Sequence, residues 1–258
     1  MNNLVSFEQQ SLIHDTLEML STFSTEAVPR VSESDWDYLE SGSDWYKVCS
    51  QGSIQSPISI DSSNTIKITS IGGPYYPFTF NYPGISLPGS FVDKTFSIQY
   101  PEGQADLCTL NGTTRKFQTT RVEFHAPAEH IVKGKQKALE LHILHKEQVT
   151  GNLFILAMLF KLSTKHNQSI QDVIDGDQVE IGKIIGDRPD LYSYFGSSTY
   201  PPCAETVLWA ICTETQSISF EQVKFFSSKW ENNQAFARGH GNNRSVQPLN
   251  HRLVFNFS

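Results

Sequence analysis

Short runs with alternating or continuous hydrophobic character dominate the chain from residue 36 onward. They are separated by Gly, Pro, Asn and Asp, a pattern typical of strands joined by turns. These runs lie at residues 66–71, 78–82, 95–100, 119–124, 140–145, 153–162 and 207–213. The run 153–162 is apolar almost throughout, which favours a fully buried strand. Helical patterns are few, with candidates at 168–174 and 219–227, so the chain is predicted to be mainly β.

The first 35 residues have a different pattern. Apolar residues recur there at helical spacing, at Leu12, Ile13, Leu17, Leu20 and Phe23. This spacing predicts an amphipathic helix over residues 7–23, followed by a polar linker around Pro29. The apolar face of such a helix must be buried, either on its own domain or on a partner protein. The expected organisation is a helix and linker over 1–35 and one domain over 36–258.

Composition narrows the class of protein. Hydrophobic residues make up 38% of the 258 residues and charged residues only 18%, which favours a folded core over disorder. The net charge is −7, and Lys and Arg form no cluster, so nucleic acid is not an expected partner. No apolar run reaches the roughly 20 residues of a membrane-spanning helix. The first 30 residues lack the pattern of a secretory signal, which favours an intracellular location.

The four cysteines, Cys49, Cys108, Cys203 and Cys212, form no Cys-x-x-Cys motif. A cysteine zinc site is therefore not predicted. In the absence of a secretory signal, four buried thiols are the default expectation.

Candidate chemistry lies on two of the predicted strands. Arg121, Glu123 and His125 are spaced by two, so their side chains share one strand face. Glu140 and His142 share a face in the same way. If the two strands are neighbours, Glu123, His125 and His142 can converge, and imidazole and carboxylate groups are good zinc ligands. A histidine on a strand is more often a hydrogen-bonded core residue, so the spacing leaves both interpretations open.

Several segments occur in the order and at about the spacing seen in α-class carbonic anhydrases. They are 36–38 (WDY), 55–58 (QSPI), 123–130 (EFHAPAEH), 140–145 (ELHILH), 196–205 (GSSTYPPCAE), 207–209 (VLW) and 242–250 (NNRSVQPLN). On these segments the chain resembles that family over about residues 36–257. The resemblance implies one domain with a large twisted, mostly antiparallel sheet and short peripheral helices, with a metal at the base of a cleft.

The resemblance also implies roles for individual residues. In the family three histidines bind zinc, and the zinc-bound hydroxide attacks CO2. Those ligand positions fall on Glu123, His125 and His142 here, and a second carboxylate that orients the third ligand falls on Glu140. The remaining matched positions are Thr199 and Glu129, which align the hydroxide; Leu144, Ile155, Val207 and Trp209, which form the apolar wall; and Cys49 and Cys203, a disulfide pair in extracytoplasmic members.

The departures from the family pattern gather at this site. Glu123 replaces the first histidine ligand, and Arg121 replaces the glutamine that supports it. Lys94 falls where active members often have a proton-shuttling histidine. Ser198 replaces an apolar wall residue, and Tyr200 replaces a much smaller residue.

Two outcomes follow for the metal. Glu123, His125 and His142 could bind zinc as a two-histidine, one-carboxylate site. The added anionic charge would raise the pKa of bound water, and Lys94 is a poor proton shuttle at neutral pH. Alternatively Arg121 neutralises Glu123 and no metal binds. We favour the second interpretation, in which the chain has no cofactor and resembles the acatalytic carbonic anhydrase-related proteins.

The sequence therefore leaves three functions open. The first is an acatalytic subunit of a larger assembly that binds other protein subunits through the helix at 7–23. The second is a zinc-dependent carbonate dehydratase with reduced activity. The third is a small-ligand binding module that uses the former cleft, lined by Ser198, Tyr200 and Trp209.

Overall fold

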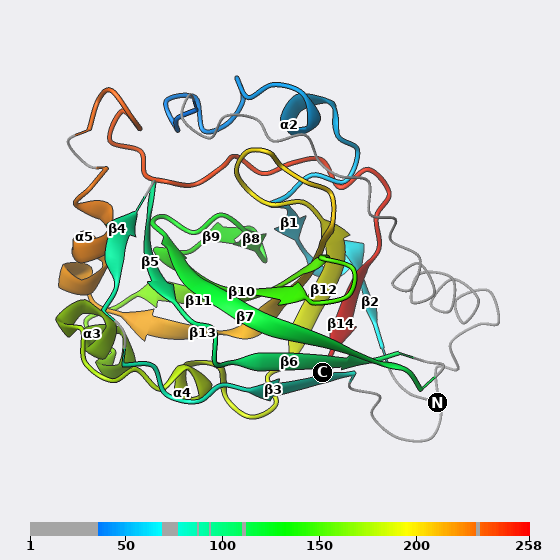
Figure 1. Ribbon diagram of the computed structural model, residues 1–258. Helices are drawn as coiled ribbons and strands as arrows, with labels where there is room; N and C mark the ends of the chain where they lie inside the picture. The colour runs from blue at the N-terminus through cyan, green and yellow to red at the C-terminus, as the bar shows by residue number, and fades with distance from the viewer. Residues whose placement is uncertain (1–35, 69–76, 87, 93, 110–111, 231–232) are drawn as a thin grey trace.

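The computed structural model describes residues 36–258 except 69–76, 87, 93, 110–111 and 231–232 (Figure 1). The helix predicted at 7–23 and the linker up to residue 35 lie outside the described residues. Within the described part of the chain, no helix has both the length and the apolar character needed to cross a membrane.

One large sheet runs through the centre of the molecule (Figure 1). Its main path, in spatial order, is β2 (Thr65–Lys67), β14 (Val254–Phe257), β12 (Leu191–Gly196), β13 (Val207–Ile218), β11 (Leu153–Leu162), β10 (Leu139–Glu147), β7 (Thr114–His125), β5 (Thr95–Gln99) and β4 (Ser90–Val92). Strand β6 (Gln104–Cys108) joins β7, and β3 (Phe78–Asn81) joins β6. The pairs β11–β13 and β14–β2 are parallel and the other pairs are antiparallel, so the predicted mainly β, mostly antiparallel architecture is confirmed.

A smaller sheet lies beside the large one. It consists of β1 (Ser59–Ile60), β8 (Ile131–Val132) and β9 (Lys135–Gln136), with β1 parallel to β8 and β8 antiparallel to β9. Ala128, in the loop that follows β7, packs with Ile60 and Val132 of this small sheet in the same buried cluster as Leu144 and Trp209.

The hydrophobic runs coincide with strands, and three strands, β7, β10 and β13, are longer than predicted. Strand β7 begins at Thr114 because its first half pairs with β6, a contact that local alternation does not reveal. Strand β13 continues to Ile218 because it stays paired with the end of β11. For the run at 66–71, the described strand ends at Lys67, and residues 69–71 lie outside the described residues.

Both predicted short helices are present. Helix α3 (Gln168–Asp175) begins where the Asn167 side chain accepts a hydrogen bond from the Ile170 amide. Helix α5 (Phe220–Ser227) begins at a capping box made by Ser219 and Gln222. Figure 1 shows α3 and α5 together at one end of the sheet. The one-turn elements α2 (Val48–Gln51), η1 (Ser62–Asn64) and α4 (Ile181–Ile185) were not predicted, because segments this short carry no periodicity.

The sheet separates two hydrophobic cores, and β11 contributes to both. Phe154, Leu156, Met158 and Phe160 lie in the larger core, whereas Ile155, Ala157 and Leu159 lie in the smaller one. This strand is therefore buried on both faces, as its continuous apolar run predicts. The candidate site belongs to the side of the smaller core.

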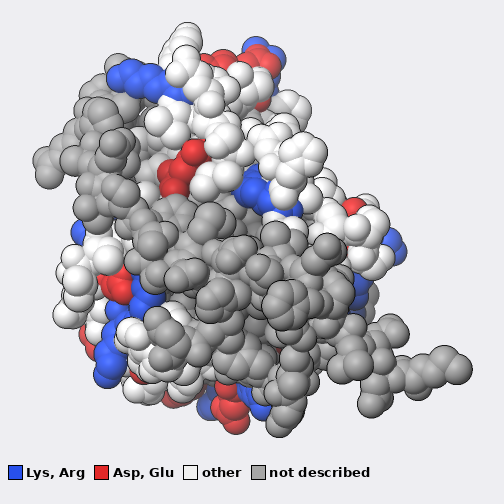
Figure 2. All heavy atoms as spheres, turned by 90° about the vertical axis from the view of Figure 1, so that its right-hand side faces the viewer, with Lys and Arg blue, Asp and Glu red and all other residues white. Residues whose placement is uncertain are grey.

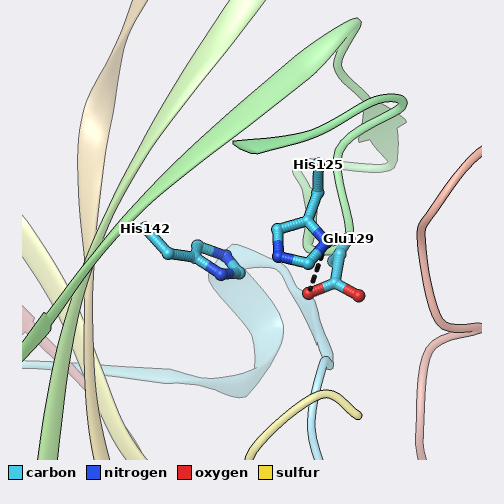
Figure 3. A group of neighbouring side chains, drawn as sticks. All are labelled: His125, Glu129 and His142. Atoms are coloured by element: carbon cyan, nitrogen blue, oxygen red, sulfur yellow. Dashed lines mark ion pairs between the residues drawn. The ribbon is translucent and has the colours of Figure 1, made fainter. Parts of the chain in front are cut away.

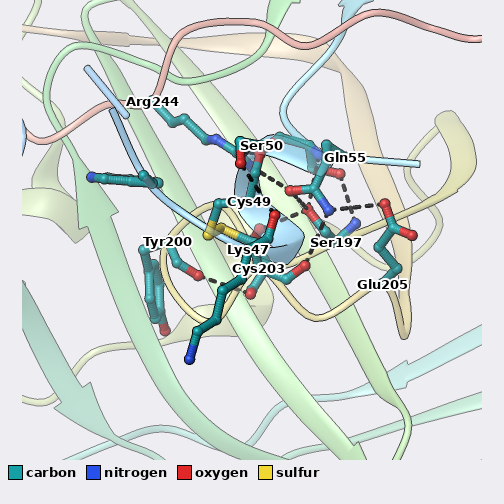
Figure 4. The surroundings of a disulfide bond; sticks show 12 residues. Lys47, Cys49, Ser50, Gln55, Ser197, Tyr200, Cys203, Glu205 and Arg244 are labelled. Atoms are coloured by element: carbon teal, nitrogen blue, oxygen red, sulfur yellow. Dashed lines mark hydrogen bonds between the residues drawn. A yellow bond between two sulfur atoms is a disulfide. The ribbon is translucent and has the colours of Figure 1, made fainter. Parts of the chain in front are cut away.

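A disulfide joins Cys49 of α2 to Cys203 in the loop between β12 and β13 (Figure 4). Their Cα atoms are 5.0 Å apart, within the usual range for a bridge. Cys212 is a buried thiol and Cys108 is exposed. The expectation of four buried thiols is therefore wrong, because the fold brings together two cysteines that are 154 residues apart.

Charged side chains of both signs are mixed over the described part of the face shown in Figure 2. No region of one sign stands out there, in keeping with the absence of a Lys/Arg cluster in the sequence.

Candidate metal centre

Strands β7 and β10 place the three ligand positions together. The strands are antiparallel neighbours, with Glu123 opposite His142 and His125 opposite Glu140. All four residues are buried. The condition set by the sequence, that the two strands be neighbours, is met.

The two histidines are each held by one hydrogen bond. His125 Nδ1 lies 2.8 Å from the carbonyl oxygen of Asn242, and His142 Nε2 lies 2.8 Å from Glu140 Oε1. Because a carbonyl or carboxylate only accepts, these two nitrogens carry the ring protons. The lone pairs are therefore left on His125 Nε2 and His142 Nδ1, the atoms available to a metal. The two imidazole rings are neighbours, with their centroids 4.6 Å apart and their planes tilted by 42° (Figure 3).

Glu140 is the most completely bonded carboxylate of the site. Its Oε1 accepts from His130 Nδ1 at 2.6 Å and from His142, while its Oε2 accepts from the backbone amides of Glu129 and His130, each at 2.8 Å. Burial raises the pKa of Glu140, but the charges and hydrogen bonds of His130 and His142 lower it by more. The net pKa is well below the usual value. Glu140 is a fixed anion that orients His142.

Glu123 is bound by Arg121 and Tyr200. Its Oε1 accepts from Arg121 Nε at 2.5 Å, and the Tyr200 hydroxyl lies 3.3 Å from both of its oxygens. Arg121 Nη2 also donates to the Tyr200 hydroxyl, at 2.5 Å. Burial lowers the pKa of Arg121, but Glu123 and Tyr200 raise it above its usual value, so this guanidinium stays charged. Burial also raises the pKa of Tyr200, which keeps its proton and can donate it to Glu123.

The two remaining substituted positions, Lys94 and Ser198, lie near Tyr200. The Tyr200 ring stacks on Trp36 with centroids 5.9 Å apart. Lys94 Nζ lies 3.9 Å from the centre of the Trp36 ring, a cation–π contact, and donates a hydrogen bond to the Trp36 carbonyl. Ser198 Oγ donates to the Tyr200 carbonyl at 3.0 Å. The residues that depart from the family pattern are thus connected to one another through Tyr200 and Trp36.

The residues matched to the hydroxide-aligning pair are both buried, but they are not hydrogen-bonded to each other. Glu129 Oε1 accepts from the Arg244 amide at 2.9 Å, and Glu129 Oε2 has no hydrogen-bond partner. His125 Nε2 is a second buried atom without a partner. Thr199 therefore lacks the contact that its matched role requires.

The residues matched to the apolar wall lie in one buried cluster. Leu144 is opposite Ile155, and Ile155 is opposite Trp209, across three adjacent strands; Val207 belongs to the same cluster. The Trp209 indole also donates to the Ser197 carbonyl at 3.0 Å. This surface is retained next to the histidines.

Two groups of metal-ligating side chains occur among the described residues. His125, Glu129 and His142 form one, and His130, Glu140 and His142 form the other; within each group the candidate ligand atoms lie within 4.8 Å of one another (Figure 3). Glu123, one of the three matched ligand positions, belongs to neither group, and its carboxylate is paired with Arg121. Two histidines and a carboxylate remain a suitable donor set for zinc. His125 Nε2 and Glu129 Oε2 are buried without a hydrogen-bond partner, so both atoms are available to bind a metal.

Three important residues of the site were not assigned a role from the sequence. Asn242 orients His125, His130 anchors Glu140, and Tyr194 bonds to His130 Nε2 through its hydroxyl at 2.8 Å. Asn242 lies in the segment 242–250, which resembles the family, but the sequence does not predict its contact with His125, 117 positions away.

The comparisons with known proteins agree with this geometry. The sequence profile of the eukaryotic-type carbonic anhydrases matches residues 34–258. Alpha carbonic anhydrase 3 of Arabidopsis thaliana is 32% identical over 86% of this chain and 79% of its own length. A carbonic anhydrase of Klebsiella pneumoniae is 29% identical over 87% of this chain and 92% of its own length.

A solved structure is similar as well. The α-carbonic anhydrase of Thermovibrio ammonificans, in complex with the inhibitor sulfanilamide, aligns with a TM-score of 0.64 and 30% identity, covering 81% of this chain and 89% of that one. The profile covers most of the chain, and its residues include both histidines, Glu140 and the apolar wall. The chain belongs to the eukaryotic-type carbonic anhydrase family.

Proposed function

We propose that this member of the family does not hydrate CO2 at an enzymatic rate and that it acts as a structural or interaction subunit. The observation that carries the proposal is the position of Glu123. The carboxylate that stands in place of the first histidine ligand is bound to Arg121 and Tyr200, and it is not part of either group of potential metal ligands.

Recruiting Glu123 as a ligand would have two unfavourable effects. It would break the contact with Arg121, a charge-assisted bond of the stronger kind. It would also add a negative charge to the metal, which disfavours ionisation of a bound water molecule. Less hydroxide at neutral pH means slower attack on CO2.

The proton pathway and the hydroxide alignment support the same proposal. Lys94, at the matched shuttle position, is held against Trp36, and an ordinary lysine pKa near 10.4 is far from neutral pH. Glu129 makes no hydrogen bond through Oε2, so it does not orient Thr199. Each of these features alone would slow the reaction.

For the interaction role, the amphipathic pattern at residues 7–23 supplies the surface that would bind another protein subunit. The Cys49–Cys203 bond supports an oxidising compartment rather than the reducing cytosol. Deleting residues 1–35 should abolish association with the partner while circular dichroism shows an unchanged β domain. Retained association would contradict this role for the helix.

A second candidate function has its own support. His125 and His142 keep the orientation and the free nitrogens that a metal needs, and the similar proteins are named carbonic anhydrases. Under this candidate the chain is a zinc-dependent carbonate dehydratase with reduced activity.

One experiment distinguishes the two candidates. Zinc content and CO2 hydration, measured by stopped flow, are compared for the native chain, Glu123→His and the pair Arg121→Gln with Glu123→His. We expect hydration by the native chain to be at background level and to rise most in the double variant, which restores the family's residues at both positions. Arg238→Gln, which removes the cation of an exposed ion pair, is the control. Zinc-dependent hydration by the native chain that is clearly above background, even if below that of the Klebsiella pneumoniae protein assayed in parallel, would overturn the proposal and support the second candidate.

A further inference from the structure

We propose that the chain binds a zinc ion through His125, His142 and Glu129, so that a glutamate from the loop after β7 replaces the missing histidine. This ligand set differs from the three ligand positions matched in the sequence. It goes beyond the proposed function, because it concerns metal binding whether or not CO2 is hydrated.

The proposal begins with buried atoms that lack a partner. Among the described residues there are four such side-chain atoms, and two of them, His125 Nε2 and Glu129 Oε2, belong to one group of potential ligands. Buried polar atoms are nearly always hydrogen-bonded, so two neighbouring exceptions need an explanation. A cation bound between them satisfies both.

The charge of Glu129 supports the same conclusion. Its side chain is completely buried, and its carboxylate accepts one hydrogen bond, from the Arg244 amide. The Arg244 guanidinium is directed elsewhere, to Gln55, Ser56 and Cys49. His125 Nδ1 is 3.7 Å from Glu129 Oε2, but its proton is donated to Asn242. The Arg244 guanidinium interacts with Glu129 electrostatically, but neither it nor His125 donates a hydrogen bond to Glu129 Oε2. This buried oxygen is therefore left for a further cation, whereas both oxygens of Glu123 have partners.

The distances allow coordination after a small adjustment. The ligand atoms of His125, Glu129 and His142 lie within 4.8 Å of one another. Ligands that are about 2.0–2.2 Å from a tetrahedral zinc lie roughly 3.3 Å apart. The Glu129 side chain would have to move toward the histidines to bind the ion. Its Oε2 has no hydrogen bond to lose, and its Oε1 is held by the Arg244 amide alone. Figure 3 shows the three side chains gathered in this way on one side of β7 and β10.

The second group of potential ligands does not qualify. Both nitrogens of His130 are bonded, to Glu140 and to the Tyr194 hydroxyl, and both oxygens of Glu140 accept two hydrogen bonds each. A metal there would have to break several of these bonds. The group containing Glu129 is therefore the one with free ligand atoms.

The test measures zinc binding by the full-length chain, by competition with a chromophoric chelator, and the visible spectrum of the Co²⁺-substituted chain. The variants are Glu129→Gln and its matched control Glu123→Gln, each of which removes one buried carboxylate charge. We expect one zinc per native chain, a loss of affinity of at least about 100-fold in Glu129→Gln, and an affinity within about threefold of native in Glu123→Gln. The Co²⁺ spectrum should be unchanged in Glu123→Gln.

Other results would overturn the proposal. These are no zinc binding by the native chain, loss of binding in Glu123→Gln alone, or native affinity in a folded Glu129→Gln. If Glu129→Gln does not fold, anomalous diffraction from crystals of the zinc-loaded native chain decides the matter, and a zinc ion without a bond to a Glu129 oxygen refutes the ligand set. CO2 hydration is not used in this test, so its outcome is independent of the proposed function.

Discussion

At the scale of single residues, Arg121 and Glu123 show how a ligand position can be reused. Arg121 and Glu123 lie on the same face of β7, and Tyr200 bonds to both of them. Glu123 is 4% exposed, so its charge would be unfavourable without this cation. Each replacement is tolerable because the other is present, and the pair should behave as one unit.

This coupling can be measured with a double-mutant cycle. Arg121→Gln leaves Glu123 buried without its cation and should lower the free energy of unfolding by about 1–3 kcal/mol, less than for a fully buried pair because Arg121 is 37% exposed. The double variant with Glu123→Gln should recover most of this loss, giving a coupling of at least about 1 kcal/mol. Urea denaturation provides the values.

The control for this cycle is the exposed Arg238–Glu40 pair, where the same cycle should give no measurable coupling. Additive effects at Arg121 and Glu123 would show that the two substitutions are independent, and the compensation argument would fail.

At the scale of elements, the disulfide connects α2 to the loop that carries Tyr200. The Cys203 amide donates to the Tyr200 carbonyl at 2.9 Å, and the Cys203 carbonyl accepts from the Gln55 side chain at 3.1 Å (Figure 4). Arg244 Nη2 donates to the Cys49 carbonyl at 2.6 Å. The bridge therefore holds the segment that positions the phenol against Glu123.

Removing the bridge should weaken the whole domain. Cys203→Ser is expected to lower the free energy of unfolding by about 2–5 kcal/mol, because a cross-link between distant positions restricts the unfolded chain. Cys108→Ser, at an exposed thiol, should leave the urea midpoint unchanged. Equal midpoints for the native chain and Cys203→Ser would mean that the bridge contributes no stability.

The elements also show what the sequence could predict. Residues 154–160 of the run 153–162 are buried on both faces of β11. The alternation gave Glu123 and His142 their strand faces, and the structure shows that the two strands are neighbours. Alternation placed Arg121 and Glu123 on one strand face and led us to favour their ion pair, which the structure contains. It could not show that the Tyr200 hydroxyl contacts both of them. Contacts such as Asn242 with His125 depend on the complete fold and have no local pattern. The bridge between Cys49 and Cys203 was suggested only by the resemblance to the family.

At the scale of the whole molecule, buried histidines couple folding to pH. His145 is completely buried between the Tyr82 hydroxyl, 2.9 Å from Nε2, and the Phe154 carbonyl, 3.1 Å from Nδ1. Burial lowers its pKa to about 3, and hydrogen bonds to the backbone only partly oppose this. The folded protein therefore holds His145 neutral over a range in which the unfolded chain binds a proton.

This difference has a definite sign. Between the ordinary histidine pKa near 6.5 and pH 3, the unfolded state binds more protons, so stability decreases as the pH falls. From pH 7 to pH 5 the contribution of His145 should be about 2 kcal/mol of lost stability. In His145→Gln the loss of stability over this interval should be smaller by that amount, and in His166→Gln, at an exposed histidine, it should match the native chain. Identical pH dependence in the native chain and His145→Gln would exclude this role.

The place of β14 in the large sheet has a consequence for synthesis of the protein. Residues 254–257 pair with β12 on one side and with β2, near residue 65, on the other. While the chain is still being made on the ribosome, β2 has no neighbour in the sheet and that edge of β12 is open. A nascent chain stalled before residue 254 should therefore expose an unpaired strand edge, of the kind that promotes aggregation and chaperone binding, and this edge closes only once residues 254–257 have emerged.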